Sequence, residues 1–553
     1  MATSRSRAQP PASLRKDAVG SGDEAGGRPP FRRVLVANRG EIAVRIIRAC
    51  HELGIEAVAV YSDADREAMH VREADAAVRL GPAAPSESYL RIDAIVEAAL
   101  ATGSEAIHPG YGFLAERAAF ARAVEVAGLA FVGPPSAAIE ALGDKLQARR
   151  TAASVGVPAV PGTLAPAAVD RPDQLASILG EARRIGFPLL VKAAAGGGGR
   201  GMRRVASARD LPAALVSGSR EAASAFGDGS VYLEREIRPA RHVEVQLLGD
   251  STGRVVALGE RDCSLQRRHQ KLVEEAPAPG LSRDERLRVH ELAVRLGSAA
   301  GLRNAATAEF LFAPDRSFYF LEVNTRLQVE HGVTELVSGL DIVREQLFLA
   351  AGAPLSEAAL AAAARAADPD GHAIEVRLSA EDPGSDFSPT PGRVTRWSMP
   401  SGPGVRVDTA MERGVVVPAE YDNLIAKVMV HAQTRDAALD RLRRALDEAE
   451  VAGIQTTLPF HRFVSRDASF RRADLSIDWV ADHWDGAGER SRAAGMALVV
   501  AGLAALEPEI GSLGGAAVDQ GPPGGTNGAA APGWGDGRWR RSGLEQATDR
   551  WPR

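Results

Sequence analysis

The chain has 553 residues, of which 45% are hydrophobic and 25% are charged, and its formal net charge at pH 7 is -5. This length predicts two to four globular domains. The small net charge gives no support for binding to nucleic acid or to an anionic membrane. Two distant cysteines, Cys50 and Cys263, exclude a disulfide framework or a zinc site and favour a reducing, cytoplasmic setting.

Residues 1–30 precede the first predicted domain. They are rich in Arg, Ser, Ala, Gly and Pro and lack an apolar core, so we interpret them as a disordered arm. Arg33 to Ala37 then forms a buried-strand run, which breaks at Gly40 into a helical pattern before Ala57 to Tyr61 resumes as a strand. This pattern predicts a Rossmann-like domain over residues 31–145. The Gly40 turn is not the GxGxxG fingerprint, so NAD is not expected.

Residues 146–236 are predicted to form linker helices and a small lid. The strand Phe187 to Lys192 ends in a lysine and leads into a glycine run that includes Gly197, Gly198 and Gly199. Backbone N–H groups of successive glycines approach phosphate oxygens without side-chain obstruction, and Lys192 is placed to neutralise them. The spacing is not that of a Walker loop. A plain flexible turn is the alternative to a lid that closes over a nucleotide.

The pattern changes to antiparallel strands after Arg241. We predict an α+β core over residues 237–365 and a further domain over residues 366–486. Beyond residue 487 the composition collapses into Gly, Ala and Pro, so residues 487–553 are predicted to be a disordered tail. Its longest apolar run is far shorter than the roughly 20 residues that span a bilayer, and no membrane segment is expected.

The basic run from Arg261 to Lys271 concentrates positive charge around His269. A solvated loop and an RNA-facing patch are the ordinary interpretations of such a run. No interleaved aromatic residues support RNA binding. Positive charge beside a nucleotide site instead favours small anions and transferring phosphoryl groups.

Glu309 lies on a strand that is predicted to pair with the strand from Phe318 to Asn324. With the four-residue loop 313–316, Glu309 lies opposite Phe320 and shares a face with Glu322 and Asn324, whereas a five-residue loop places it on the other face. Two carboxylates and an amide are hard oxygen donors that suit Mg²⁺ on nucleotide phosphates. Solvated strand carboxylates are the alternative.

A polar side chain occupies every second position of the track that runs through Glu322, Asn324, Arg326, Gln328 and Glu330. In an extended strand these side chains share one face. Eight residues at about 3.3 Å each cover roughly 26 Å, which is longer than one small molecule. Either the track bends or it serves several ligands, and a surface strand with its polar face in water is the plain alternative.

Together these motifs resemble the biotin carboxylase component of biotin-dependent carboxylases, an ATP-grasp enzyme, over about residues 32–485. The glycine run, the Gln266 to Lys271 segment, the Glu309, Glu322 and Asn324 set and Ala373-Ile-Glu-Val-Arg377 occur in family order. The resemblance implies an α/β and α+β architecture: a Rossmann-like N-terminal domain, an ATP-grasp lid and core, and a biotin carboxylase C-terminal domain. Gly332 departs from the family, which commonly has Pro there.

The resemblance also implies roles for residues of this chain. ATP would lie among Lys145, Lys192, Glu234, His242, Gln266, His269 and Leu311, and Glu309, Glu322 and Asn324 would hold Mg²⁺ or Mn²⁺. Bicarbonate would contact Lys271, Arg326, Gln328 and the Val329 backbone, with Glu330 as the general base. Arg377 would steady the phosphate and the biotin enolate, with Tyr111 near the biotin. The strand should then end near Asn324 and the chain should curl, so that Glu330 reaches bicarbonate beside the γ-phosphate.

The same resemblance implies partners. No Ala-Met-Lys-Met-type hairpin occurs in the sequence, so biotin is expected on a separate carrier protein, beside a carboxyltransferase subunit, and a homodimer is expected. The implied reaction is the first half-reaction of an acyl-CoA carboxylase, such as that of fatty acid biosynthesis. The alternatives are a pyruvate carboxylase component, another ATP-grasp ligase and a catalytically silent regulatory subunit.

Overall fold

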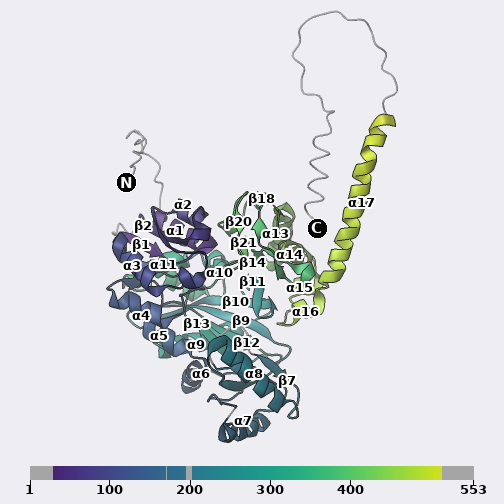
Figure 1. Ribbon diagram of the computed structural model, residues 1–553. Helices are drawn as coiled ribbons and strands as arrows, with labels where there is room; N and C mark the ends of the chain where they lie inside the picture. Colours follow the sequence, from purple (N-terminus) through teal and green to yellow (C-terminus); the bar gives the residue numbers. More distant parts are fainter. Residues whose placement is uncertain (1–28, 170, 195–201, 514–553) are drawn as a thin grey trace, which may run out of the picture.

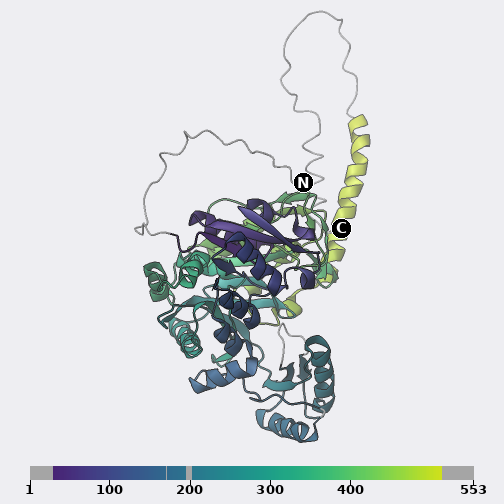
Figure 2. The ribbon, with the colours of Figure 1, turned by 60° about the vertical axis from the view of Figure 1, so that its left-hand side comes forward.

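The computed structural model describes residues 29–169, 171–194 and 202–513. Its elements form a large body with a smaller lobe below it, and one long helix extends along the opposite end (Figure 1). Rotation separates the lobe clearly from the body (Figure 2). Residues 1–28 of the predicted arm, the glycine run with Gly197, Gly198 and Gly199, and residues 514–553 of the predicted tail lie outside the described residues.

The first domain is a parallel five-stranded sheet with helices between the strands, as predicted. Its strands are β1 (Arg33–Val36), β2 (Glu56–Ser62), β3 (Ala76–Gly81), β4 (Ala106–His108) and β5 (Ala130–Phe131), in the order β3-β2-β1-β4-β5. The helices are α1 (Gly40–Glu52), α2 (Met69–Glu73), α3 (Ile92–Thr102), α4 (Ala118–Val126) and α5 (Ser136–Gly143). On α1 the buried Ile42, Ile46 and Ile47 recur at helical spacing and cover the sheet.

The lower lobe is a three-stranded antiparallel sheet with two helices. It contains α7 (Pro172–Ile185), β6 (Leu189–Ala193), β7 (Arg203–Val205), α8 (Leu211–Phe226) and β8 (Val231–Arg235), with strand order β7-β6-β8. The helix α6 (Lys145–Ser154) leads into it. Leu189 and Val191 alternate with Lys192 on β6, so the strand buries its apolar face and directs Lys192 to the other.

One eight-stranded sheet crosses the body, in the order β13-β12-β9-β10-β11-β14-β21-β19. The strands are β9 (Arg241–Gly249), β10 (Val255–Arg267), β11 (Gln270–Ala276), β12 (Asn304–Phe312), β13 (Phe318–Asn324), β14 (His372–Ser379), β19 (Val405–Thr409) and β21 (Leu424–Ala432). Every neighbouring pair is antiparallel. The sheet joins the predicted core to the predicted C-terminal domain, so side chains from both meet on one surface.

Helices flank this sheet, and the C-terminal part adds short strands. The helices are α9 (Arg283–Ala299), α10 (His331–Ser338), α11 (Ile342–Ala350), α12 (Glu357–Arg365), α13 (Arg435–Glu448), α14 (Leu458–Val464), α15 (Ala468–Arg471) and α16 (Trp479–His483). The short strands are β15 (Glu381–Asp382), β16 (Ser388–Pro389), β17 (Gly392–Arg393), β18 (Arg396–Ser398), β20 (Val416–Val417) and β22 (Glu450–Ala452). Thr434 caps α13 by accepting from the Ala437 N–H, as its position before the helix predicts.

The register of β12 against β13 corrects one prediction. Phe310, not Glu309, lies opposite Phe320. The connection runs from Ala313 to Ser317 and is one residue longer than the predicted four-residue loop. That length alone would turn Glu309 away from Glu322. A register shift after Glu309 restores the alignment, because the bulge adds one residue to β13, and Glu309 pairs directly with Glu322.

The tail also differs from the prediction. Residues 487–513, predicted to be disordered, belong to the long helix α17 (Gly486–Leu513), whose Arg490 is ion-paired with Asp382 of the body. Ala is the commonest residue of this stretch and favours a helix, whereas Gly and Pro become denser after Leu513. Within the described ranges no helix is long and apolar enough to cross a membrane.

Gly332 provides a test of packing at the start of α10. A Cβ added there would overlap Met429 Sδ, and Met429 is fully buried on β21. We expect Gly332→Ala to lower the free energy of unfolding by about 1 to 3 kcal/mol through overpacking. The loss should shrink in a Met429→Ala background, where the space is free. Equal losses in both backgrounds, measured by denaturant unfolding, would contradict this contact.

Candidate active site

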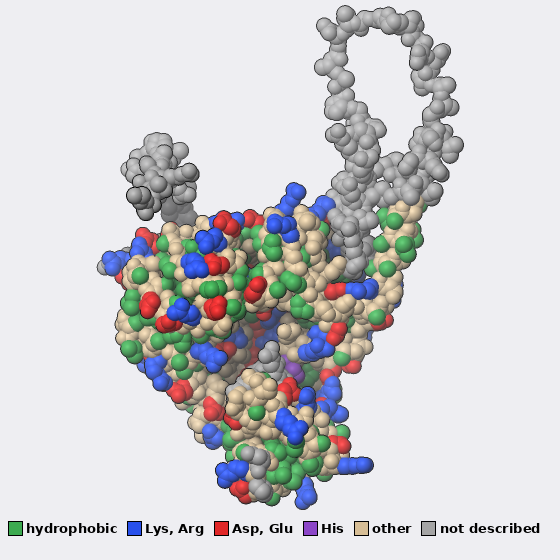
Figure 3. Space-filling view, in the orientation of Figure 1, with side chains coloured by type: hydrophobic (Ala, Val, Ile, Leu, Met, Phe, Trp, Pro, Cys, Tyr) green, Lys and Arg blue, Asp and Glu red, His purple; other side chains and the backbone are tan. Residues whose placement is uncertain are grey.

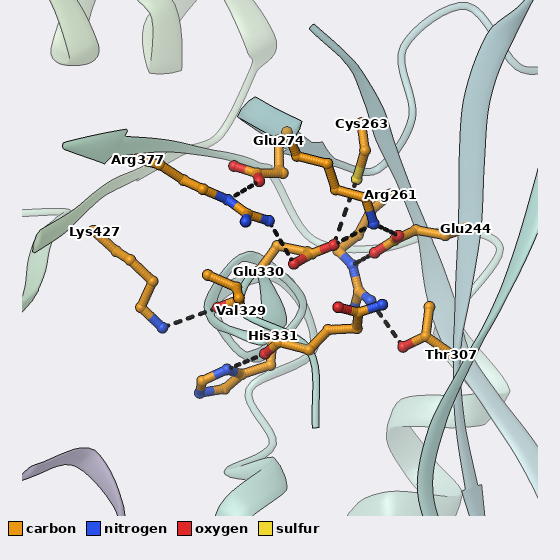
Figure 4. Close-up of polar contacts among 12 residues, drawn as sticks. Glu244, Arg261, Cys263, Glu274, Thr307, Val329, Glu330, His331, Arg377 and Lys427 are labelled. Carbon is orange, nitrogen blue, oxygen red and sulfur yellow. Dashed lines mark hydrogen bonds and ion pairs between the residues drawn. The ribbon is translucent and has the colours of Figure 1, made fainter. Parts of the chain in front are cut away.

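The candidate site is organised around one buried ammonium group on the central sheet. Lys271 Nζ, from β11, donates to Glu244 Oε2 at 2.5 Å, to Glu309 Oε1 at 2.9 Å and to Glu330 Oε1 at 2.7 Å. These carboxylates come from β9, from β12 and from the residue that precedes α10. Figure 4 shows Glu244 and Glu330 turned toward the same point from opposite sides. Lys271 therefore joins three segments that are distant in sequence.

The electrostatics of the cluster keep its central groups charged. Burial alone disfavours the ammonium of Lys271, but Glu244, Glu309 and Glu330 raise its pKa well above the usual value. Glu330 has no exposed surface, and burial opposes its ionisation. Lys271, Arg377 and Arg261 outweigh this effect and hold the pKa of Glu330 well below its usual value. Glu330 is thus an ionised carboxylate shielded from water.

Glu309 brings the predicted metal-binding residues together. Its Oε1 accepts from Asn324 Nδ2 at 2.8 Å, and Glu322 lies directly opposite it in the ladder. Burial opposes ionisation of Glu309, but Lys271 and His242 hold its pKa well below the usual value. Two carboxylates and an amide oxygen on one face fit a hard cation such as Mg²⁺.

The polar track bends, as predicted. β13 ends at Asn324, and the side chains that follow it fold back on one another. Arg326 Nη1 donates to Gln328 Oε1 at 2.8 Å, and Gln328 Nε2 donates to Glu309 Oε1 at 3.3 Å. Arg326 Nε also donates to Glu116 Oε2 at 2.9 Å. The bend places Arg326 and Gln328 beside the predicted metal-binding face and brings Glu330 into contact with Lys271.

Two basic residues predicted to bind ATP lie on the lobe side of the cluster. Lys192 Nζ donates to Glu234 Oε2 at 2.5 Å, and Arg149 Nη1 donates to Glu234 Oε1 at 2.9 Å. Lys145 Nζ lies 3.5 Å from Glu322 Oε2. In the space-filling view, basic, acidic and histidine side chains line the hollow between lobe and body (Figure 3).

The β10–β11 hairpin and β12 supply the remaining predicted ATP residues. Gln266 pairs with Lys271 across the hairpin, and Arg268 and His269 form its turn with φ of 49° and 67°. Burial, together with Lys192 and His242, lowers the pKa of His269. His242 Nε2 lies 3.1 Å from Glu309 Oε2. Leu311 is opposite His242 in the β12–β9 ladder, which puts this apolar side chain beside the same site.

Arg377, Val329 and Tyr111 lie in different surroundings. Arg377 Nη2 donates to Glu330 Oε2 at 2.9 Å, so the predicted biotin-side arginine contacts the predicted base. The Val329 carbonyl accepts from Lys427 Nζ at 2.9 Å (Figure 4). The Tyr111 hydroxyl is buried without a hydrogen-bond partner among the described residues. The structure therefore does not join Tyr111 to the cluster.

Several residues of the cluster were not assigned a role from sequence. Glu244 follows His242 by two positions on β9, and this alternation was a usable signal. Arg261 Nε donates to Glu244 Oε1 at 2.5 Å and lies in the basic run. Glu274 and Lys427 reach the cluster from β11 and β21, and no local pattern distinguishes them because the pairing of distant strands brings them there.

Three family models match the chain in order. Residues 30–139 match the biotin carboxylase N-terminal domain, residues 144–358 match the ATP-binding domain of the carbamoyl-phosphate synthase L chain, and residues 375–482 match the biotin carboxylase C-terminal domain. These ranges cover the Rossmann-like domain, the lobe with the core, and the end of the central sheet.

Curated relatives and solved structures agree with these matches. A biotin carboxylase from Pseudomonas aeruginosa is 49% identical over 450 residues, covering 81% of this chain and 98% of the relative. A pyruvate carboxylase subunit from Methanothermobacter thermautotrophicus is 46% identical over 453 residues, covering 82% and 90%. The biotin carboxylase domain dimer of 2-oxoglutarate carboxylase from Hydrogenobacter thermophilus, solved with MgADP, ADP and bicarbonate, has a TM-score of 0.77 and 42% identity, covering 82% and 98%. From this fold, this site and these likenesses, the chain belongs to the biotin carboxylase family of ATP-grasp enzymes.

Proposed function

We propose that the Lys271 cluster is the centre at which this chain carboxylates biotin with ATP and bicarbonate. The activity itself, ATP-dependent carboxylation of biotin, follows from the family. The observation that supports the assignment is one ammonium held by Glu309 on the metal-binding side and by Glu330 on the base side. An ionised, buried Glu330 supports an active enzyme over a silent regulatory subunit.

The nucleotide lies on the lobe side of the cluster. Lys145 and Lys192 neutralise phosphate charge, and Glu234, His242, Gln266, His269 and Leu311 complete the pocket. Glu309, Glu322 and Asn324 hold Mg²⁺ or Mn²⁺, and the metal, when bound, spreads the charge that develops on the transferring phosphoryl group. Gly197, Gly198 and Gly199, which lie outside the described residues, are assigned to phosphate binding by the family resemblance. The relative solved with MgADP and bicarbonate supports this ligand set.

Bicarbonate occupies the base side of the cluster. Lys271, Arg326, Gln328 and the Val329 backbone bind it, and Glu330 takes its proton. The carboxylate is ionised but weakly basic while Lys271 and Arg377 both contact it. Transfer of the Lys271 contact to bicarbonate removes one of these cations and raises the proton affinity of Glu330 at the moment it is needed. Attack on the γ-phosphate then gives carboxyphosphate.

Biotin receives the carboxyl group in the second step. Carboxyphosphate releases CO₂ and phosphate, the phosphate takes the proton from the ureido nitrogen, and Arg377 stabilises the enolate with Tyr111 close by. The biotin is carried by a separate carrier protein and passed to a carboxyltransferase subunit. The chain acts as a homodimer in the cytoplasm, where two free buried cysteines suit a reducing setting.

The final acceptor is proposed as an acyl-CoA, as in fatty acid biosynthesis. Pyruvate is the alternative acceptor, because one of the relatives is a pyruvate carboxylase subunit. Mass analysis of the carboxylated product formed with the co-purifying carboxyltransferase distinguishes them. Carboxylation of pyruvate alone would reject the acyl-CoA assignment.

The base assignment is tested by Glu330→Gln, which keeps the shape and removes the proton acceptor. We expect bicarbonate-dependent ATP cleavage to fall by about 10²- to 10⁴-fold, the usual contribution of a positioned base. The control is Glu345→Gln, another buried carboxylate, which accepts from the Ser356 N–H outside the cluster. An unchanged rate in Glu330→Gln would eliminate Glu330 as the base.

Removal of one charged oxygen donor tests the metal-binding face. Glu309→Gln should raise the Mg²⁺ concentration needed for half-maximal ATP cleavage by about tenfold or more, because an amide is a weaker ligand than a carboxylate. The measurement is an Mg²⁺ titration at saturating ATP, with Glu345→Gln again as the control. A lower maximal rate with the same Mg²⁺ midpoint would mean that Glu309 acts only through Lys271.

A further inference from the structure

Arg377 is shared between two buried carboxylates. Its Nε donates to Glu274 Oε1 at 2.6 Å, and its Nη2 donates to Glu330 Oε2 at 2.9 Å. Figure 4 shows the guanidinium lying between Glu274 and Glu330. The arginine that serves the second step is therefore held, on one side, by the base of the first step.

Glu274 has no role in the reaction as proposed. It has no exposed surface, and its Oε2 has no hydrogen-bond partner within the described part of the chain. A buried carboxylate is costly unless it is paired, and the hydrogen bond that Glu274 makes with its side chain is the one to Arg377. This contact indicates that Glu274 holds the Arg377 side chain in position.

We propose that Glu274 is a positioning residue that couples the two chemical steps. It anchors Arg377 through Nε throughout the reaction. Protonation of Glu330 releases the Nη2 donor of Arg377, which then turns to the phosphate and the biotin enolate. This inference rests on the proposed function of Glu330 and Arg377. It adds a residue to that mechanism and gives an order to the two uses of the guanidinium.

The charge changes of the first step drive this release. The O–H bond of bicarbonate breaks, its proton goes to Glu330, and the electron pair left on oxygen forms the new bond to the γ-phosphorus as ADP leaves. The contact between Arg377 and Glu330 then changes from an ion pair to a hydrogen bond with a neutral acid, which lacks the attraction between opposite charges. The contact to Glu274 keeps its charge, so the guanidinium pivots about Nε and is not lost from the site.

The ionisation of Glu274 responds to the same event. Burial raises the pKa of Glu274 to about 7, with Arg377 opposing the rise and the charge of Glu330 adding to it. When Glu330 takes up a proton, that repulsion disappears and Glu274 ionises more readily. Its hold on Arg377 therefore strengthens as the hold of Glu330 weakens. The charged groups that face Glu274 are Lys271 on its own strand, Arg377 and Glu375 on β14, and Glu330 before α10.

Glu375 provides a matched control. It lies directly opposite Glu274 in the β11–β14 ladder, it is equally buried, and both of its carboxylate oxygens lack a hydrogen-bond partner among the described residues. Burial raises its pKa well above the usual value, with Lys427 opposing the rise and Glu274 adding to it. Burial thus favours the neutral form of Glu375, and Glu375→Gln keeps the shape of that form.

The experiment compares two rates in the full-length chain. One is bicarbonate-dependent ATP cleavage without biotin, which requires only the first step, and the other is carboxylation of free biotin. In Glu274→Gln we expect the first rate to stay within about twofold and the second to fall by about 10- to 100-fold in kcat, because a reacting group is displaced. Both rates should be unchanged in Glu375→Gln. Equal losses of both rates in Glu274→Gln, or no loss of carboxylation, would overturn the proposal.

The wild-type pH profile tests the same idea without any substitution. The ratio of carboxylation to biotin-free ATP cleavage should rise as pH passes upward through about 7, because only ionised Glu274 anchors Arg377. A ratio that is flat between pH 6 and 8 would reject the coupling. Failure of the proposed function is a separate result: the wild-type chain would then show no bicarbonate-dependent ATP cleavage at any pH.

Discussion

The site depends on the contact of one ammonium, that of Lys271, with three buried carboxylates. Transfer of a charge from water into a protein interior costs several kcal/mol even after relaxation, so Glu244, Glu309 and Glu330 need basic partners, and Lys271 is the one that all three share. The three carboxylates come from β9, from β12 and from the residue before α10. Pairing of β9, β10, β11 and β12 in one sheet is what brings them within reach of Lys271.

The buried carboxylates around this cation fall into two kinds. Glu309 and Glu330 face Lys271 and have pKa values held below the usual range, which suits a metal ligand and a base. Glu274, on the same strand as Lys271, and Glu375, on the neighbouring strand β14, have raised pKa values. Opposite pKa shifts in neighbouring acids suit them to different protonation roles. Arg377 contacts both kinds, and in the proposed mechanism it links the proton transfer from bicarbonate to the later step at biotin.

Much of this arrangement could be predicted from sequence, because the polar track from Glu322 to Glu330 and its bend after Asn324 are local patterns. The strand partner of Glu309 is harder to predict. The longer turn moves Glu309 off the face of Glu322 and the bulge moves it back, and neither feature has a local sequence pattern. Glu274 reaches Arg377 only through the pairing of β11 with β14, which are about a hundred residues apart. The helix α17 is not evident from sequence, because Gly and Pro interrupt its Ala-rich stretch and both are more frequent in the residues that follow.

The central claim is that Lys271 exchanges a carboxylate partner for bicarbonate when substrates bind. A crystal structure of this chain with Mg²⁺, a non-hydrolysable ATP analogue and bicarbonate tests it most directly. The account predicts that Lys271 Nζ moves from Glu330 to a bicarbonate that lies within hydrogen-bond distance of Lys271, Arg326 and Glu330. A bicarbonate bound away from Glu330, or a Lys271 that keeps its contact with Glu330, would contradict it.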